Sequence, residues 1–418
     1  MSAGWTAERA EDYLLSRELF GMRFGLDRMQ RLMTALGAPH RSFRSIHVVG
    51  TNGKSSTVRM LARILEMHGT RTGAYLSPHL VSFTERIRID DADIDDAAFG
   101  AAVERAARAA ELVDRTLGPD DRVTQFEALT AAGYSELAAR GVDVAVVEAG
   151  LGGRYDATSV IPSAVQVLTN VGLEHTRWLG PTIADIAGEK LAVVRDGSTL
   201  VVGALHPDAE AQARETAARR GARLVHAPAT SDAPLAAPGA FQRANFALAT
   251  AATEALLGEL DPGAVRAAAQ DVRVPGRCEV IDRDPLTILD SAHNPAGARA
   301  LVEALPEVAQ GRGRTVGVVS ILEDKDAAGI LRELLPSCEA LVLTRNLNPR
   351  ALPPATLESL AGQLGADPAA LELEPDPRRA LARARELAGR DGAVVATGSI
   401  YLVADLVRPP GARRVSML

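Results

Sequence analysis

The chain has 418 residues, more than one hydrophobic core usually supports, so we expect two domains. Apolar residues make up 47% of the sequence, which is enough for substantial cores. The net charge is −7, and lysine and arginine are scattered along the chain, which argues against a nucleic acid partner.

Segments that would export or anchor the protein are not recognisable in the sequence. Cys278 and Cys338 are too few for a disulfide framework, and we expect both to be buried. The first residues mix acids and bases at helical spacing and lack the order of a signal peptide. No apolar run approaches the roughly 18 to 20 residues that a membrane span needs. We therefore expect a cytoplasmic protein without a membrane partner.

The first predicted elements are a helix, a strand, a loop and a second helix. Residues 8–36 have helical periodicity, which ends before a short β-type run at residues 45–49. A glycine-bearing loop follows at residues 50–56, and an amphipathic helix is predicted over residues 58–68. Strand, loop and helix in this order form the first unit of a parallel α/β sheet, in which the loop faces the N-terminus of the helix.

The same alternation continues along the next part of the chain. Strands are predicted at residues 142–147, 164–168 and 199–202, with a helix at 126–140. This pattern is typical of a doubly wound sheet. Residues 227–239 are rich in proline, alanine and aspartate without periodicity, and we predict a loop there.

A second α/β segment starts after a short helix that ends in RVPGR. Its predicted elements are strands at residues 287–289, 315–319, 341–343 and 393–396 and a helix at 296–305. We therefore predict an α/β protein with a doubly wound domain over residues 1–271 and a smaller domain over residues 272–418.

The loop at Gly50–Ser56 is a short form of a phosphate-binding loop. Its glycines let backbone N–H groups turn around phosphate oxygens, Lys54 neutralises them, and the hydroxyl that follows can reach Mg²⁺. The full pattern is not met, because Val48 stands where the first glycine would be. A surface turn could carry the same letters, but the position between a strand and a helix favours a phosphate site.

Two further side chains are expected at the same edge of the sheet. Glu148 ends a predicted strand, and His175 follows the next strand by a few residues. Taken separately, a solvated acid and a structural histidine are the simpler interpretations. Beside a phosphate loop they predict metal or phosphate contacts, because Mg²⁺ prefers carboxylate, hydroxyl and phosphate oxygens with an occasional imidazole.

Polar residues also flank predicted strands of the second domain. Arg277 could clamp a phosphate, and Asp290, in the string DSAHNP, could hold a ribose or a base edge. Each segment is also simply a good turn or helix start, and that alternative stays open.

Ordered motifs along nearly the whole chain resemble the folylpolyglutamate synthase / dihydrofolate synthase family, a branch of the Mur-type amide ligases. They include HVVGTNGKSS, YLSPHLVSFTERIRI, FEALTAAGY, EAGLGGRYDATSVI, GLEHTRWLGPTIADIAGEK, QRANFALA, PGRCEVI, DSAHNP and ATGSIYLVADL. The resemblance implies an N-terminal P-loop ATPase domain and a C-terminal Rossmann-like ligase domain. It also implies ATP and two Mg²⁺ ions as cofactors.

The resemblance assigns roles residue by residue. The nucleotide contacts it implies are Asn52, Gly53, Lys54, Ser55, Asn245, Arg277, Asp290 and His293. The metal ligands it implies are Ser77, Glu148 and His175, and the catalytic residues are Lys54, Lys190 and His175. The substrate contacts it implies are Gly25, Leu26, Asp27, Thr124, Phe126, Glu127 and Asp156. Lys190 matches a carbamylated lysine, in which CO₂ turns a cation into an anion able to support a second Mg²⁺.

The implied reaction joins L-glutamate to dihydropteroate or a reduced folate through an acyl phosphate. The protein is then a dihydrofolate synthase, a folylpolyglutamate synthase or both, and the resemblance implies a monomer. Ser55, Glu174 and Ser291 stand where the family more often has Gly, Asp and Gly. One alternative is a Mur-type ligase for a cell-wall precursor or another amino-acid acceptor. Another is a non-catalytic nucleotide-binding protein, against which the joint presence of the candidate catalytic residues stands.

Overall fold

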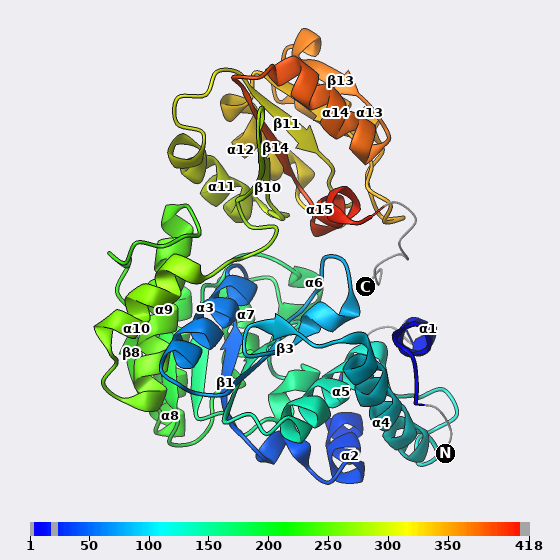
Figure 1. The fold of residues 1–418 in the computed structure, drawn as a ribbon, viewed down its shortest axis with the longest axis vertical. Helices are drawn as coiled ribbons and strands as arrows, with labels where there is room; N and C mark the ends of the chain where they lie inside the picture. The colour runs from blue at the N-terminus through cyan, green and yellow to red at the C-terminus, as the bar shows by residue number, and fades with distance from the viewer. Residues whose placement is uncertain (1–3, 18–23, 410–418) are drawn as a thin grey trace. The chain divides into compact units, whose positions relative to one another are not determined.

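The computed structural model describes residues 4–17 and 24–409 (Figure 1). By its contacts this part of the chain divides into two compact units. Unit 1 runs as far as Pro234 and also includes Ala244–Val272, whereas unit 2 comprises Leu235–Arg243 and the chain from Arg273 onward. None of the helices in the described ranges has the length and apolar character needed to cross a bilayer.

Unit 1 is built on an eight-stranded sheet in the order β4-β3-β2-β5-β1-β6-β7-β8. Its strands are β1 (Arg44–Val49), β2 (Thr72–Tyr75), β3 (Ile87–Ile89), β4 (Ala92–Asp93), β5 (Val144–Glu148), β6 (Val165–Leu168), β7 (Thr199–Val202) and β8 (Arg223–His226). Six neighbouring strands run parallel, in the order β2, β5, β1, β6, β7 and β8. β3 and β4 add an antiparallel edge beside β2. β5 and β6 are buried along their whole length, which explains why both are continuous apolar runs in the sequence.

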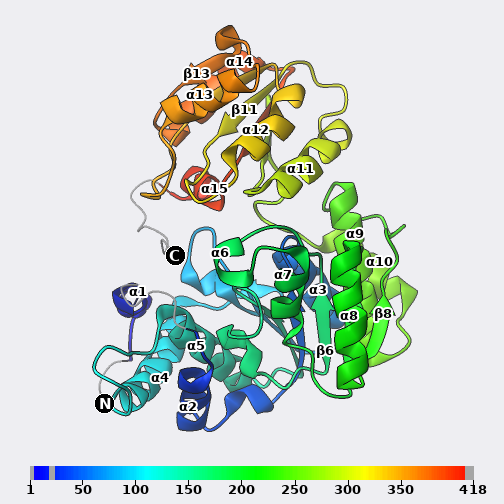
Figure 2. The same cartoon turned by 180° about the vertical axis from the view of Figure 1, so that it is seen from behind.

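Helices cover both faces of this sheet (Figures 1 and 2). They are α1 (Ala7–Arg17), α2 (Asp27–Ala35), α3 (Lys54–Met67), α4 (Asp96–Asp114), α5 (Gln125–Ala139), α6 (Thr176–Leu179), α7 (Ile183–Leu191), α8 (Pro207–Arg220), α9 (Ala240–Leu257) and α10 (Pro262–Asp271). One core joins α1, α2, α4 and α5 to β2 and β5, and Tyr134 and Phe99 are fully buried in it. Another joins α7 and α8 to β6 and β7. The doubly wound α/β prediction is confirmed.

The predicted continuous helix over residues 8–36 is wrong. Within the described residues it is two helices, α1 and α2, and residues 18–23 lie outside the described part of the chain. Phe24 and Gly25 are not helical, and Gly25 has φ +122°, a backbone conformation that side chains with a Cβ rarely adopt. The helical spacing of apolar residues therefore extends across a point at which the backbone leaves the helix.

Unit 2 contains a six-stranded sheet in the order β13-β12-β11-β14-β10-β9. Its strands are β9 (Glu279–Arg283), β10 (Leu286–Leu289), β11 (Thr315–Val319), β12 (Ala340–Leu343), β13 (Leu371–Leu373) and β14 (Ala393–Thr397). All are parallel except β9, which pairs antiparallel with β10. The helices are α11 (Pro295–Val308), α12 (Ala327–Leu334), α13 (Pro354–Gln363), α14 (Pro377–Ala388) and α15 (Ile400–Val407).

Each unit has cores of its own, so a cavity in one core tests how that core is packed. Ile330 of α12 is fully buried with Val319, Leu343 and Leu357. We expect Ile330→Ala to lower the free energy of unfolding by about 2–5 kcal/mol, measured by urea denaturation, because a cavity replaces apolar contacts. Leu347→Ala is the control: Leu347 is 57% exposed, and its loss should cost less than about 0.5 kcal/mol. Equal losses would contradict this description of the core.

Candidate active site

The loop between β1 and α3 has the geometry expected of a phosphate loop. Gly53 caps α3 with φ +82°, and the helix begins at Lys54. The Nζ atom of Lys54 donates to the carbonyls of Gly50 and Thr51, each at 3.1 Å. The lysine therefore folds back over its own loop, and the N-terminus of α3 faces the same loop. The predicted order of strand, loop and helix is confirmed.

The segment that follows β6 supports this loop from the side. Thr169 Oγ1 donates to the carbonyl of Asn52 at 2.6 Å, and Asn52 N–H donates to Asn170 Oδ1 at 2.9 Å. A Cβ on Gly50 would lie 1.8 Å from Thr169 Oγ1, so only glycine fits there. The sequence does not predict these roles of Thr169 and Asn170, although both follow a predicted strand that ends at the same edge.

Glu148 joins the phosphate loop to the end of β2. Ser55 Oγ donates to Glu148 Oε1 at 2.8 Å, and the Ser77 N–H donates to Oε2 at 3.2 Å. Glu148 is the last residue of β5, between β2 and β1, and it is buried. The structure therefore brings together two of the three expected metal ligands, Ser77 and Glu148, with the hydroxyl of Ser55.

A buried arginine lies behind Ser77. Arg86 Nη1 donates to Ser77 Oγ at 3.3 Å, and Arg86 Nε donates to His79 Nδ1 at 2.9 Å. Both Arg86 and His79 are buried. This network fixes the position of the Ser77 hydroxyl, and neither Arg86 nor His79 is predicted as a site residue from the sequence.

Lys190 of α7 meets the phosphate loop at the same carbonyl as Lys54. Its Nζ atom donates to Gly50 O at 2.7 Å, and its side chain is buried. Burial lowers the pKa of Lys190 to about 7, and the positive charge of Lys54 acts in the same direction. Its amine is therefore substantially uncharged near neutral pH.

His175 is the third expected metal ligand, and its role stays a prediction. It precedes α6 with φ +52°, and its Nε2 atom lies 3.8 Å from Glu174 Oε1. Among the described residues no three His, Cys, Asp or Glu side chains gather as a preformed metal cage. Mg²⁺ usually keeps several waters and takes one or two carboxylates plus substrate phosphates, so the oxygens of Ser77 and Glu148 fit it without such a cage.

Asn245 of α9 lies against the phosphate loop. A Cβ on Gly53 would be 2.5 Å from Asn245 Oδ1. The absence of a side chain at Gly53 therefore allows this close approach, and the predicted nucleotide contact of Asn245 stays a prediction.

The expected substrate segments are held together by a buried ion pair. Arg28 Nε donates to both oxygens of Glu127, at 3.0 and 3.1 Å. Glu127 Oε2 also accepts from the N–H of Thr124 at 2.8 Å, in a capping box at the start of α5. Leu26 precedes α2, whose first residue, Asp27, forms an exposed pair with Arg31. Glu127 and Thr124 thus have structural roles, and their substrate contacts stay a prediction.

Phe126 and Asp156 meet at the loop that follows β5. A Cβ on Gly150 would lie 2.7 Å from Phe126 Cζ and 3.0 Å from Asp156 Oδ2. Asp156 accepts from the N–H groups of Leu151 at 2.8 Å and Thr158 at 3.0 Å, and burial raises the pKa of its carboxyl group. These two expected substrate residues therefore adjoin one another.

The residues expected to contact nucleotide from unit 2 lie at one edge of its sheet. Asp290 follows β10 and accepts from the N–H groups of Cys278 and Ala292, each at 2.7 Å. Arg277 precedes β9, whose first residue pairs with the last residue of β10. His293 Nδ1 lies 2.9 Å from the carbonyl of Ser291. Burial raises the pKa of Asp290, which the positive charge of Arg277 opposes.

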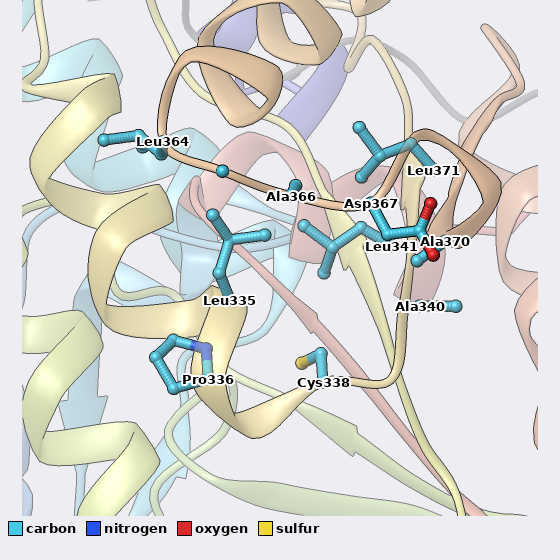
Figure 3. Close-up of a pocket in the computed structure, with 11 residues that line it drawn as sticks. Leu335, Pro336, Cys338, Ala340, Leu341, Leu364, Ala366, Asp367, Ala370 and Leu371 are labelled. Atoms are coloured by element: carbon cyan, nitrogen blue, oxygen red, sulfur yellow. The ribbon is translucent and has the colours of Figure 1, made fainter.

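A cavity of about 360 Å³ lies elsewhere in unit 2 (Figure 3). Its lining includes Leu335, Cys338, Leu341 and Leu371, with the carboxylate of Asp367. Most of these residues lie at or before the starts of β12 and β13, whereas Asp290 follows the end of β10. The cavity is therefore at the opposite edge of the sheet from Asp290 and is not part of the candidate nucleotide contacts.

The Arg28–Glu127 pair predicts a large stability effect. Glu127→Gln should lower the free energy of unfolding by about 1–3 kcal/mol, because the buried guanidinium loses one of its two carboxylate partners and keeps Asp121 at 3.2 Å. Chemical denaturation measures this change. Arg31→Gln breaks an exposed ion pair on the same helix and should cost about 0–1 kcal/mol. A Glu127→Gln protein as stable as the Arg31→Gln protein would show that the buried pair does not hold α2 to α5.

Comparison with known proteins identifies the family to which this chain is similar. Residues 276–400 match the family model described as Mur ligase, glutamate ligase domain. The dihydrofolate synthase/folylpolyglutamate synthase of Mycobacterium tuberculosis is 38% identical over 380 residues, covering 81% of this chain and 77% of that protein.

Solved structures give the same assignment over most of both chains. Folylpolyglutamate synthase from M. tuberculosis complexed with ADP has a TM-score of 0.89 and 34% identity, covering 95% of this chain and 96% of that chain. E. coli FolC in complex with DHPP and ADP has a TM-score of 0.85 and 27% identity, covering 96% of each chain. The bifunctional Yersinia pestis enzyme complexed with AMPPNP and a Mn ion has a TM-score of 0.83 and 29% identity, again covering 96% of each. The chain therefore belongs to the dihydrofolate synthase/folylpolyglutamate synthase family of Mur-type ligases.

Proposed function

We propose that the protein is an ATP- and Mg²⁺-dependent ligase that adds L-glutamate to a folate-type acceptor, as a dihydrofolate synthase, a folylpolyglutamate synthase or both. The observation that carries this proposal is the convergence of Lys54, Lys190 and the Glu148 network on one phosphate loop. The names of the relatives favour a folate acceptor over a cell-wall precursor.

In this proposal the phosphate loop binds the phosphates of the nucleotide. The backbone N–H groups of the loop and the N-terminus of α3 face the phosphates, and Lys54 adds a positive charge. In binding phosphate, the Lys54 ammonium exchanges its contacts with Gly50 and Thr51 for phosphate oxygens.

The residues around Glu148 fit a divalent cation. Ser77, Glu148 and Ser55 offer hard oxygen atoms beside the loop, which is the donor set that Mg²⁺ prefers. A bound Mg²⁺ would supply charge neutralisation at the β- and γ-phosphates. Arg86 holds the Ser77 hydroxyl in place, so this oxygen is positioned before any ligand binds.

The chemistry proceeds in two steps. A carboxylate oxygen of the acceptor attacks the γ-phosphorus, the bond to the β-phosphate oxygen breaks, and ADP leaves with an acyl phosphate formed. The amine of glutamate then attacks the acyl carbon, loses a proton, and displaces phosphate to leave an amide. The ammonium of Lys54 reduces the repulsion between the acceptor carboxylate and the phosphates.

Carbamylation of Lys190 is part of this proposal. An uncharged amine adds CO₂ to form a carbamate and releases one proton, and the pKa of about 7 supplies that amine near neutral pH. The product carries a negative charge beside Lys54, so the modification places an anion next to that cation. The resulting anion is an oxygen ligand suited to a second Mg²⁺.

Lys54→Ala tests the catalytic role of the loop. Wild-type protein given dihydropteroate or tetrahydrofolate, glutamate and MgATP should release phosphate, and Lys54→Ala should reduce the rate by roughly 100-fold or more. Arg332→Ala removes an exposed positive charge from α12 and should leave the rate unchanged. Thermal denaturation checks that both variants fold. Full activity in the Lys54→Ala protein would contradict the mechanism.

The protonation state of Lys190 predicts that enzyme activity depends on CO₂ and on pH. Below the pKa of about 7 the amine is protonated and cannot add CO₂, whereas above it the uncharged amine can. Enzyme stripped of CO₂ should lose activity and recover it with bicarbonate, more fully at about pH 8 than at about pH 6. A carbamate signal with ¹³C-labelled bicarbonate should appear in the wild type and be absent in Lys190→Ala. The same signal in both proteins would assign the carbamate to another amine.

A further inference from the structure

Three consecutive peptide units of the phosphate loop are anchored on the segment that follows β6. The N–H of Thr51 donates to Asn170 O at 3.0 Å, and the N–H of Asn52 donates to Asn170 Oδ1 at 2.9 Å. The third unit is held by its carbonyl, since Asn52 O accepts from Thr169 Oγ1 at 2.6 Å. The same two residues therefore contact every peptide unit in this part of the loop.

The planarity of the peptide bond gives each of these contacts a second effect. The peptide bonds of the phosphate loop are trans. In a planar trans peptide the N–H and the C=O point in opposite directions, so a contact that fixes one group also fixes the other. Each hydrogen bond to the segment after β6 therefore sets the direction of the group on the far side of the peptide.

At the first two units the far side faces the lysines. The carbonyl of Gly50 belongs to the same peptide unit as the Thr51 N–H. It accepts from Lys190 Nζ at 2.7 Å and from Lys54 Nζ at 3.1 Å. The carbonyl of Thr51 shares a unit with the N–H that follows it, and it accepts from Lys54 Nζ at 3.1 Å. Asn170 thus holds both carbonyls in the direction of the two ammonium groups.

At the third unit the far side is the N–H of Gly53. Asn52 O faces Thr169, so this N–H points the opposite way, away from the segment after β6. Gly53 caps α3, and N–H groups at the start of a helix bind anions. Without the hydroxyl the peptide could turn over, because the flip changes φ of Gly53 and glycine accepts either sign of φ. The Thr169 hydroxyl is the contact that selects one direction.

Thr169 is itself confined from two sides. A Cβ on Gly50 would lie 1.8 Å from Thr169 Oγ1, and a Cβ on Gly203, after β7, would lie 2.7 Å from Thr169 O. β6 lies between β1 and β7 in the sheet, so both glycines follow neighbouring strands. Thr169 is only 5% exposed. Its hydroxyl is therefore held in place beside Asn52 before any ligand binds.

We propose that Thr169 is a positioning residue for nucleotide binding, which turns the Gly53 N–H toward the phosphates by holding the carbonyl of the same peptide. The inference rests on the phosphate-binding part of the proposed function and adds a residue outside the loop to it. Thr169 acts through the peptide and not by contact with the nucleotide. Nucleotide affinity should therefore depend on a hydroxyl that a different strand connection supplies.

Thr169→Val tests this role by direct binding of MgADP, without turnover. Valine has nearly the shape of threonine but no hydroxyl, so the Asn52 carbonyl loses its donor. Isothermal titration calorimetry should give a Kd about tenfold higher than that of the wild type, because the peptide is no longer held in one direction. Thr169→Ala removes the same hydroxyl without a methyl group facing Gly50, and it should weaken binding equally. Thr169→Ser keeps the hydroxyl and should bind within about twofold of the wild type.

Thr253→Val is the matched control. Thr253 is buried in α9, and its hydroxyl donates to Ala249 O at 2.9 Å, so this change also removes a buried hydroxyl-to-carbonyl hydrogen bond. It should lower thermal stability to a similar degree and leave the Kd for ADP within about twofold. Equal weakening of ADP binding in the two valine variants would show that Thr169 acts only on the fold, and the inference would be wrong.

The outcomes separate this inference from the proposed function. If Thr169→Val and Thr169→Ala bind ADP as tightly as the wild type does, the inference is wrong and the proposed function is unaffected. If binding weakens as expected but the wild-type protein releases no phosphate with either folate acceptor, the proposed function fails and the inference stands. If the wild-type protein does not bind ADP, both fail.

Discussion

The candidate site depends on the meeting of two lysines at one backbone carbonyl. Lys54 and Lys190 both donate to Gly50 O, one from the helix that follows the loop and the other from α7. Burial lowers the pKa of the Lys190 amine, and the positive charge of Lys54 lowers it further. The phosphate loop thus concentrates positive charge where a triphosphate carries negative charge, and it leaves a reactive amine at the same place.

Hydrogen bonds from neighbouring segments hold the phosphate loop in a fixed position. Thr169 and Asn170 hold the loop from β6, and Glu148 holds it from β5. Parallel strands make this possible, because their carboxyl ends bring loops that are distant in the sequence to one edge.

Much of the fold could be predicted from the sequence, because buried parallel strands are continuous apolar runs. β7 and β11 have the predicted bounds, and the loop over residues 227–239 contains neither helix nor strand. The sequence does not predict β2 or α4, since β2 is a four-residue strand and α4 is rich in alanine, which gives a weak apolar stripe. The phosphate-loop residues could be predicted, because they form a motif that is local in the sequence. Arg86 and Thr169 act through contacts between segments that are distant in the sequence, which spacing alone does not reveal.

Glu148 holds two segments, one through each of its carboxylate oxygens. One oxygen accepts from the Ser55 hydroxyl and the other from the Ser77 amide N–H. A hydroxyl can rotate to become an acceptor, but a backbone N–H cannot. A glutamine here could therefore keep both contacts, with its oxygen accepting from the Ser77 N–H and its NH₂ group donating to Ser55 Oγ. Electrical charge and mechanical attachment are separable at this position, because the amide of the same shape would remove the first and keep the second.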